Sequence, residues 1–124
     1  MVLWIGVLLA GGAGAVLRFL VDGAIGRRAA RSRHFVGLPF GTLVVNVSGA
    51  ALLGLLSSLA LNRHVALLAD TAFVGSYTTF STWMLETQRL SEERQVRDAV
   101  ANIVGSIVLG ICAALFGQWI AGRL

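Results

Sequence analysis

The chain has 124 residues, of which 56% are hydrophobic and only 13% are charged, and its mean hydropathy is +0.81. Soluble domains are about half apolar and about a quarter charged, so this composition is typical of a membrane protein. All ten basic residues are arginine. The resulting positive charge does not indicate a nucleic-acid binder, because a chain with so little polar surface has only short loops to present to water.

Four apolar stretches are long enough to cross a bilayer, whose hydrocarbon core needs about 20 helical residues. They are residues 2–20, 40–61, 65–88 and 98–121, and the second of them has no charged residue. A soluble helical bundle would instead place polar residues along one face of each helix. The sequence therefore predicts an all-α integral membrane protein with a single four-helix domain over residues 1–124. The first stretch lacks the positive start of a signal peptide, so we expect it to be retained.

Small residues recur four positions apart, which lets membrane helices approach each other closely. The repeats are Gly6, Ala10 and Gly14; Ala50, Gly54 and Ser58; and Ala101 with Gly105. Ordinary helix packing explains most of these positions. Four helices bury little surface on their own, so the pattern favours a close-packed oligomer.

Arginines are distributed unequally between the two sides that four spans would create. Two lie on the side of the termini and the second connection, namely Arg63 and Arg123. Seven lie in the first and third connections: Arg27, Arg28, Arg31, Arg33, Arg89, Arg94 and Arg97. Cytoplasmic loops carry an excess of Arg and Lys, so these two connections are predicted to be cytoplasmic and both termini external.

Polar side chains form narrow stripes within two of the apolar stretches. Thr42 and Asn46 are four residues apart in the second, and Asn102 and Ser106 are four apart in the fourth. Neutral hydrogen-bond donors suit a small anion that must be held weakly enough to leave again. Hydrogen bonding between helices is the alternative explanation, and the stripes alone do not decide between the two.

The third stretch contains GSYTTFSTW at residues 75–83, where glycine and β-branched or hydroxylated residues disfavour a helix. A break there would free backbone carbonyls, which suit a hard cation such as Na⁺. Phe80 and Trp83 follow on one helical face, and the electropositive edges of their rings could favour an anion, although simple packing is also possible. No enzyme is indicated, because His34 and His64 lie in connections without an apparent nucleophile–base pair.

Four motifs in order resemble the Fluc (CrcB-type) fluoride channel family, and the resemblance covers nearly the whole chain. They are GGAGAVLR at 11–18, PFGTLVVNVSGA at 39–50, GSYTTFSTW at 75–83 and NIVGSIVLG at 102–110. The resemblance implies four helices per subunit with the third broken mid-membrane, and an antiparallel, dual-topology-type dimer with two fluoride pores. It also implies passive export of cytosolic fluoride across the cell membrane, without ATP.

The same resemblance implies roles for individual residues. Backbone carbonyls of Gly75 and Thr78 would hold a structural sodium ion at the dimer centre. The fluoride pore would involve Thr42, Asn46, Phe80, Trp83 and Ser106, and Arg18 would belong to a vestibule.

Two positions depart from the family pattern as we read it: Trp83 stands where a second pore Phe is usual, and Asn102 where Tyr is usual. Together with the arginine bias, these departures leave two alternatives. The chain could pair with an oppositely oriented paralogue, or it could be a non-conducting partner subunit of a heterodimeric channel. A small multidrug-type proton-coupled exporter is a further alternative. It would need a carboxylate in the first helix, and residues 2–20 contain none.

Overall fold

The computed structural model describes residues 1–31 and 39–124, and the regular structure in these ranges is helical. Arg33 and His34, which entered the charge and enzyme arguments above, lie outside the described residues. The described elements are α1 (Val2–Ala30), α2 (Phe40–Ser58), α3 (Arg63–Ala66), the π-helical η1 (Leu67–Val74), α4 (Gly75–Tyr77), α5 (Ser81–Glu92) and α6 (Val96–Ala121).

Within the described residues, three helices are long and apolar enough to cross a membrane: α1, α2 and α6. The expected segment 65–88 is divided among α3, η1, α4 and α5, and none of these reaches that length alone. An all-α, multi-pass membrane protein follows from these helices together with the composition.

The first helix is longer than the predicted apolar segment, because it continues through residues 21–30. This correction has a local cause. Alanine and arginine are good helix formers, and Arg27 and Arg28 in the last turn interact favourably with the negative end of the helix dipole. The prediction followed apolarity, which marks the part of a helix that can lie in the bilayer and not the point where the helix ends. At the other helices the bounds differ by a few residues: α2 ends at Ser58, and α6 begins at Val96.

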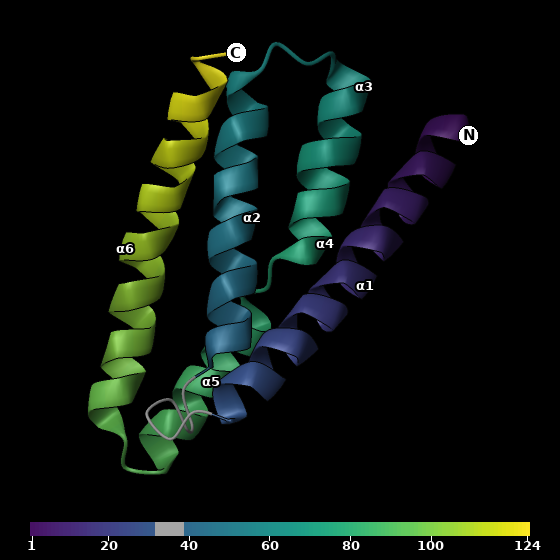
Figure 1. The fold of residues 1–124 in the computed structure, drawn as a ribbon. Helices are drawn as coiled ribbons and strands as arrows, with labels where there is room; N and C mark the ends of the chain where they lie inside the picture. Colours follow the sequence, from purple (N-terminus) through teal and green to yellow (C-terminus); the bar gives the residue numbers. More distant parts are fainter. Residues whose placement is uncertain (32–38) are drawn as a thin grey trace.

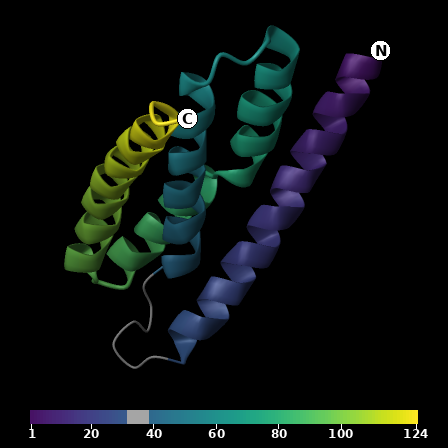
Figure 2. The same ribbon diagram turned by 45° about the horizontal axis from the view of Figure 1, so that its top comes forward.

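The helices form one elongated bundle in which α2 and α6 lie side by side (Figures 1 and 2). The column of α3, η1 and α4 packs against α1, and α5 packs against α6. Figure 1 shows both termini and the α2–α3 connection at one end of the bundle. The end of α1 and the α5–α6 connection lie at the opposite end, so the two ends differ in the segments that they present.

The contact between α2 and α6 depends on two glycines. A Cβ atom on Gly54 would collide with the backbone of Ala114, and one on Gly117 would collide with the carbonyl of Ala51. The backbones of the two helices therefore approach more closely than any larger residue would permit. Gly54 belongs to the small-residue stripe in the sequence, whereas Gly105 of the α6 stripe has open space around it in the described chain.

Few large side chains are fully buried, and Val45 and Leu90 are the largest of them. Apolar side chains instead cover the outer faces of α1 and α6, for example Leu8, Phe19, Ile111 and Leu115. A water-soluble monomer rarely exposes so much continuous apolar surface. These faces are suited to lipid or to another subunit.

Candidate functional site

The candidate site forms where the chain leaves helical geometry between α4 and α5. The helix ends at Tyr77, Thr78 is extended with φ −82° and ψ 162°, and α5 begins at Ser81. The interruption falls within GSYTTFSTW, the segment of weak helix formers. Helix α2 passes directly beside it, because Gly49 is buried and a Cβ there would overlap the methyl group of Thr78.

Asn46 of α2 binds the interrupted backbone through both ends of its side-chain amide. Thr79 N–H donates to Asn46 Oδ1 at 2.8 Å, and Asn46 Nδ2 donates to the Thr79 carbonyl, also at 2.8 Å. A helix break exposes backbone groups that must find partners when water is absent. Asn46 supplies partners for two of them. Its Nδ2 group carries two hydrogens, and this pairing uses one.

An open pocket of about 280 Å³ lies beside the break. Four of the residues predicted for ion binding line it together: Asn46, Thr78, Phe80 and Trp83. The rings of Phe80 and Trp83 meet edge to face, with centroids 5.7 Å apart and planes at 78°. Phe80 is 69% exposed in the single chain, so one wall of the pocket is not covered by this subunit.

A second pocket, of about 150 Å³, contains two more of the predicted residues, Arg18 and Thr42. Thr79 lines both pockets, so the break separates them. The Thr42 side chain is buried, and its hydroxyl donates to Glu86 Oε1 at 2.9 Å. Arg18 Nη1 donates to the Thr78 carbonyl at 3.4 Å, which ties α1 to the break.

Two further predicted residues lie outside both pockets. Ser106 lies on α6 and lines neither pocket, and no other predicted pore residue of the described chain is bonded to it. Gly75 lies on an exposed face at the start of α4. The single chain therefore brings together only part of the predicted site.

The two backbone carbonyls expected to coordinate a structural sodium ion, those of Gly75 and Thr78, are compatible with that role in this structure. In a continuous helix the Gly75 carbonyl would accept from Thr79 N–H, but Thr79 N–H donates to Asn46 instead. The Gly75 carbonyl is thus released at an exposed face. The Thr78 carbonyl accepts one long hydrogen bond from Arg18 and keeps a second lone pair. A hard cation is coordinated by more oxygens than these two, so the described chain supplies only part of such a site.

Several residues in the site were not assigned a role from the sequence. Glu86 lies in α5, where its carboxylate accepts the hydrogen bond of Thr42 and its Oε2 has no partner within the described residues. Thr79 binds Asn46, and Thr87 bonds to Asn102. The sequence pattern that could have identified these residues is a carboxylate and several hydroxyls within the apolar stretch 65–88. Their partners are 15 to 44 residues away in the chain, so only the fold identifies them.

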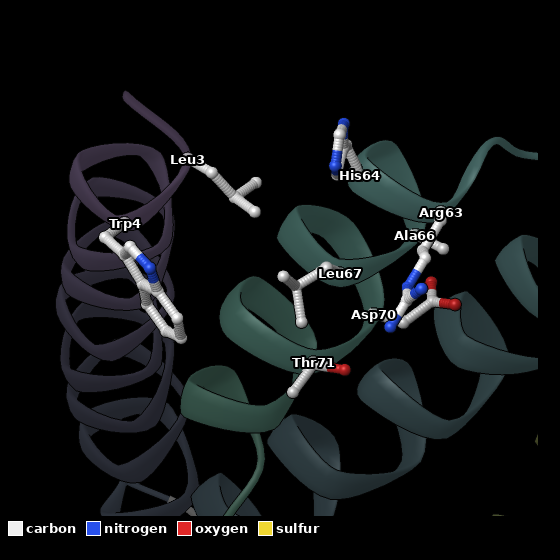
Figure 3. Close-up of a pocket in the computed structure, with 8 residues that line it drawn as sticks. All are labelled: Leu3, Trp4, Arg63, His64, Ala66, Leu67, Asp70 and Thr71. Atoms are coloured by element: carbon white, nitrogen blue, oxygen red, sulfur yellow. The ribbon is translucent and has the colours of Figure 1, made fainter. Parts of the chain in front are cut away.

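A larger pocket of about 570 Å³ lies near the N-terminus, between the start of α1 and the column of α3 and η1 (Figure 3). Leu3 and Trp4 form one side, while Arg63, His64 and Asp70 lie across from them. Asp70 Oδ1 is buried without a hydrogen-bond partner in the described chain. None of the predicted ion-binding residues lines this pocket, so its size does not make it the candidate site.

Comparison with known proteins matches the sequence of this chain to one family. The family model described as "CrcB-like protein, Camphor Resistance (CrcB)" matches residues 5–118. The chain belongs to the CrcB family. It is 68% identical over 118 residues to "Fluoride-specific ion channel FluC 2" of Mycolicibacterium paratuberculosis, covering 95% of this chain and 93% of that protein.

Other relatives carry similar names. The chain is 65% identical to "Fluoride-specific ion channel FluC 2" of Mycobacterium tuberculosis (strain ATCC 25618 / H37Rv), over 96% of this chain and 90% of that protein. It is 42% identical to "Fluoride-specific ion channel FluC 1" of Leifsonia xyli, over 94% and 84% respectively. CrcB family membership places the chain among ion channels rather than enzymes.

Proposed function

We propose that the chain forms a fluoride-selective channel that lets cytosolic fluoride leave the cell passively. The observation that carries the proposal is the pairing of Asn46 with the backbone of Thr79 beside two aromatic rings in an open pocket. The relatives named as fluoride-specific channels support the choice of ion.

The pocket offers an anion weak, neutral contacts. The second Nδ2 hydrogen of Asn46 can donate to fluoride without breaking the bond to Thr79. The edges of Phe80 and Trp83 are electropositive and can approach an anion without hydrating it. Of the described residues that line this pocket, none is charged. Fluoride would therefore be bound loosely enough to leave again, as conduction requires.

A second subunit completes the site in this proposal. Segment 65–88 crosses the membrane as a fourth span, broken at residues 78–80, and an antiparallel partner covers the exposed sides of Gly75 and Phe80. Carbonyls of Gly75 and Thr78 from both subunits would then hold a sodium ion. The ion supplies fixed positive charge at the dimer centre and is not transported.

The orientation of the chain follows from its arginines. Arg27, Arg28 and Arg89 belong to the last turns of α1 and α5, at the same end of the bundle (Figure 1). The α2–α3 connection and the C-terminus, which carry Arg63 and Arg123, lie at the other end. By the positive-inside rule, the end that carries Arg27, Arg28 and Arg89 lies on the cytoplasmic side of the cell membrane.

This charge bias favours one insertion direction, so we also propose an oppositely oriented paralogue as partner. In that arrangement this chain completes the partner's pore, and it could do so without conducting along its own aromatic wall. Labelling of single cysteines at each terminus in intact cells tests the point. Labelling from one side only supports fixed orientation, and equal labelling from both sides contradicts it.

Fluoride efflux from liposomes tests the proposed function. The purified chain is reconstituted with potassium fluoride or potassium chloride inside, and efflux is started with valinomycin and followed with ion-selective electrodes. We expect rapid fluoride efflux and little chloride efflux, either from the chain alone or after addition of a paralogue. Absence of fluoride efflux in both preparations, with protein incorporation verified, would reject the channel.

A further inference from the structure

Trp83 is attached to α6 by its indole nitrogen. Its Nε1–H donates to the backbone carbonyl of Asn102 at 3.3 Å. Asn102 lies inside α6, where its carbonyl also serves the helical bond to Ser106 N–H four residues on. A carbonyl oxygen has two lone pairs, so it can accept both bonds. The indole thus uses the second lone pair of a carbonyl whose position is fixed by the helix.

Two more hydrogen bonds, both involving Thr87, complete a three-residue loop of Trp83, Asn102 and Thr87. Asn102 Nδ2 donates to Thr87 Oγ1 at 2.9 Å, and Thr87 Oγ1 donates to the Trp83 carbonyl at 2.8 Å. The Thr87 hydroxyl has one hydrogen and accepts one bond here, so the directions of both bonds are consistent. Both the side chain and the backbone of Trp83 are therefore connected to Asn102.

The hydrogen bond from the indole also determines which part of Trp83 faces the pocket. The Nε1–H is directed at α6, so it is not a free donor in the pocket beside the break. The indole also packs against Phe80 at 78°, which sets the relative direction of the two ring edges. A phenylalanine at position 83 would have the same ring edge but no donor to attach it to α6.

We propose that Asn102 and Thr87 are positioning residues for the aromatic wall, holding the Trp83 ring through this three-residue loop so that a carbon edge rather than the N–H lines the ion path. Its consequence for ion flow rests on the proposed fluoride channel. The geometric part does not, because the ring would be held whether or not the chain conducts. Trp83 and Asn102 then act together. The backbone carbonyl of Asn102 accepts the bond from the indole, and the side-chain amide of Asn102 donates to Thr87.

Two readouts on one set of variants test the proposal. The first is the indole N–H resonance of Trp83 in ¹⁵N-tryptophan-labelled protein, identified by its loss in Trp83→Phe. The second is fluoride and chloride efflux from liposomes. The variants are Thr87→Val, which keeps the shape but removes the hydroxyl, Thr87→Ser, which retains it, and Asn102→Ala. Gln88→Ala is the matched control, because it removes an exposed hydrogen bond to Glu92 from the same helix.

We expect Thr87→Val to shift the Trp83 indole resonance and to reduce fluoride efflux by about tenfold, the size of one buried hydrogen bond lost. Thr87→Ser restores both values, and Asn102→Ala changes them in the same direction as Thr87→Val. In a Trp83→Phe background, Thr87→Val changes efflux by less than about twofold, because no indole remains to be positioned. Gln88→Ala leaves both readouts at the wild-type value.

Other results overturn the proposal. An unmoved indole resonance in folded Thr87→Val shows that the loop does not hold the ring. An equal loss of efflux in the wild-type and Trp83→Phe backgrounds shows that Thr87 acts on the helix rather than through the indole. If Thr87→Val does not fold, Asn102→Ala with the same two readouts decides. If wild-type protein gives no fluoride efflux, either by itself or with a paralogue, only the channel proposal is rejected, and the indole resonance still decides the positioning.

Discussion

The contact between α2 and α6 and the contact between α2 and the helix break are built in opposite ways. Between α2 and α6, Gly54 of α2 and Gly117 of α6 lack side chains, so the two backbones can approach each other closely. At the break, Asn46 adds a polar side chain that hydrogen-bonds to the backbone of Thr79 at both ends. The first contact would serve any membrane bundle. The second holds non-helical backbone inside an apolar segment, an arrangement that is tolerated only where protein or a cavity surrounds it.

The difference separates stability from function along a single helix. Asn46 and Gly54 are two turns apart on α2, yet we expect their replacement to have different consequences. A change at Gly54 should weaken the fold without changing which ion passes. A change at Asn46 should alter ion flow in a protein that still folds.

The largest effect is expected for Asn46→Asp. The carboxylate still accepts from Thr79 N–H, but it turns a negative oxygen toward the Thr79 carbonyl and places a charge in the proposed fluoride path. We expect fluoride efflux from liposomes to fall by about 100-fold, since a buried unmatched charge costs several kcal/mol. The control is Ser58→Asp at the exposed end of α2, which adds the same charge away from the break. Efflux that is equal in the two variants would remove Asn46 from the pathway.

Gly54→Ala should produce an intermediate effect of a different kind. The added methyl group meets the backbone of Ala114, so the helices must separate, at a cost of about 1–3 kcal/mol. We expect a lower midpoint of thermal unfolding in detergent and an unchanged fluoride-to-chloride ratio in the fraction that folds. Gly12→Ala is the control, because no described atom outside its own stretch of helix lies within 4 Å of the added carbon. An altered ion ratio in Gly54→Ala would end the separation between the two contacts.

The smallest effect is expected for Thr42→Val, which removes the hydroxyl that donates to Glu86. Glu86 then loses its partner in the second pocket, at a cost of about 1–3 kcal/mol. We expect fluoride efflux to fall by about fivefold, and Thr42→Ser to restore it. Restoration by serine links the loss to the hydroxyl. Full activity in Thr42→Val would place this pocket outside the ion path.

Much of this arrangement could be expected from local sequence. Four apolar segments indicate the membrane, and the weak helix formers of residues 75–79 indicate where helical geometry fails. The stripe of Thr42 and Asn46 marks the face of α2 that meets the break. These are properties of neighbouring residues, and a single sequence displays them.

The hydrogen-bond partners of these residues could not be predicted from local sequence. Trp83 bonds to Asn102, and Thr42 to Glu86, across connections whose geometry depends on how the helices pack. The predicted stripe of Asn102 and Ser106 also divides in the structure, because Asn102 turns to Thr87 and Ser106 lines neither pocket. All the ion-binding roles assigned from the sequence stay predictions, those of Asn46, Phe80 and Trp83 as well as those of Gly75, Thr78 and Ser106.

Fluoride titration of the Asn46 side-chain amide by NMR tests the central claim most directly. The resonances of its two Nδ2 hydrogens are assigned from their absence in Asn46→Asp, and chloride at equal ionic strength is the reference. One hydrogen is bonded to the Thr79 carbonyl, so we expect fluoride to shift the other hydrogen strongly and chloride to shift neither. Resonances that respond equally to both salts, or to neither, at fluoride concentrations that support efflux would contradict a fluoride site at the helix break.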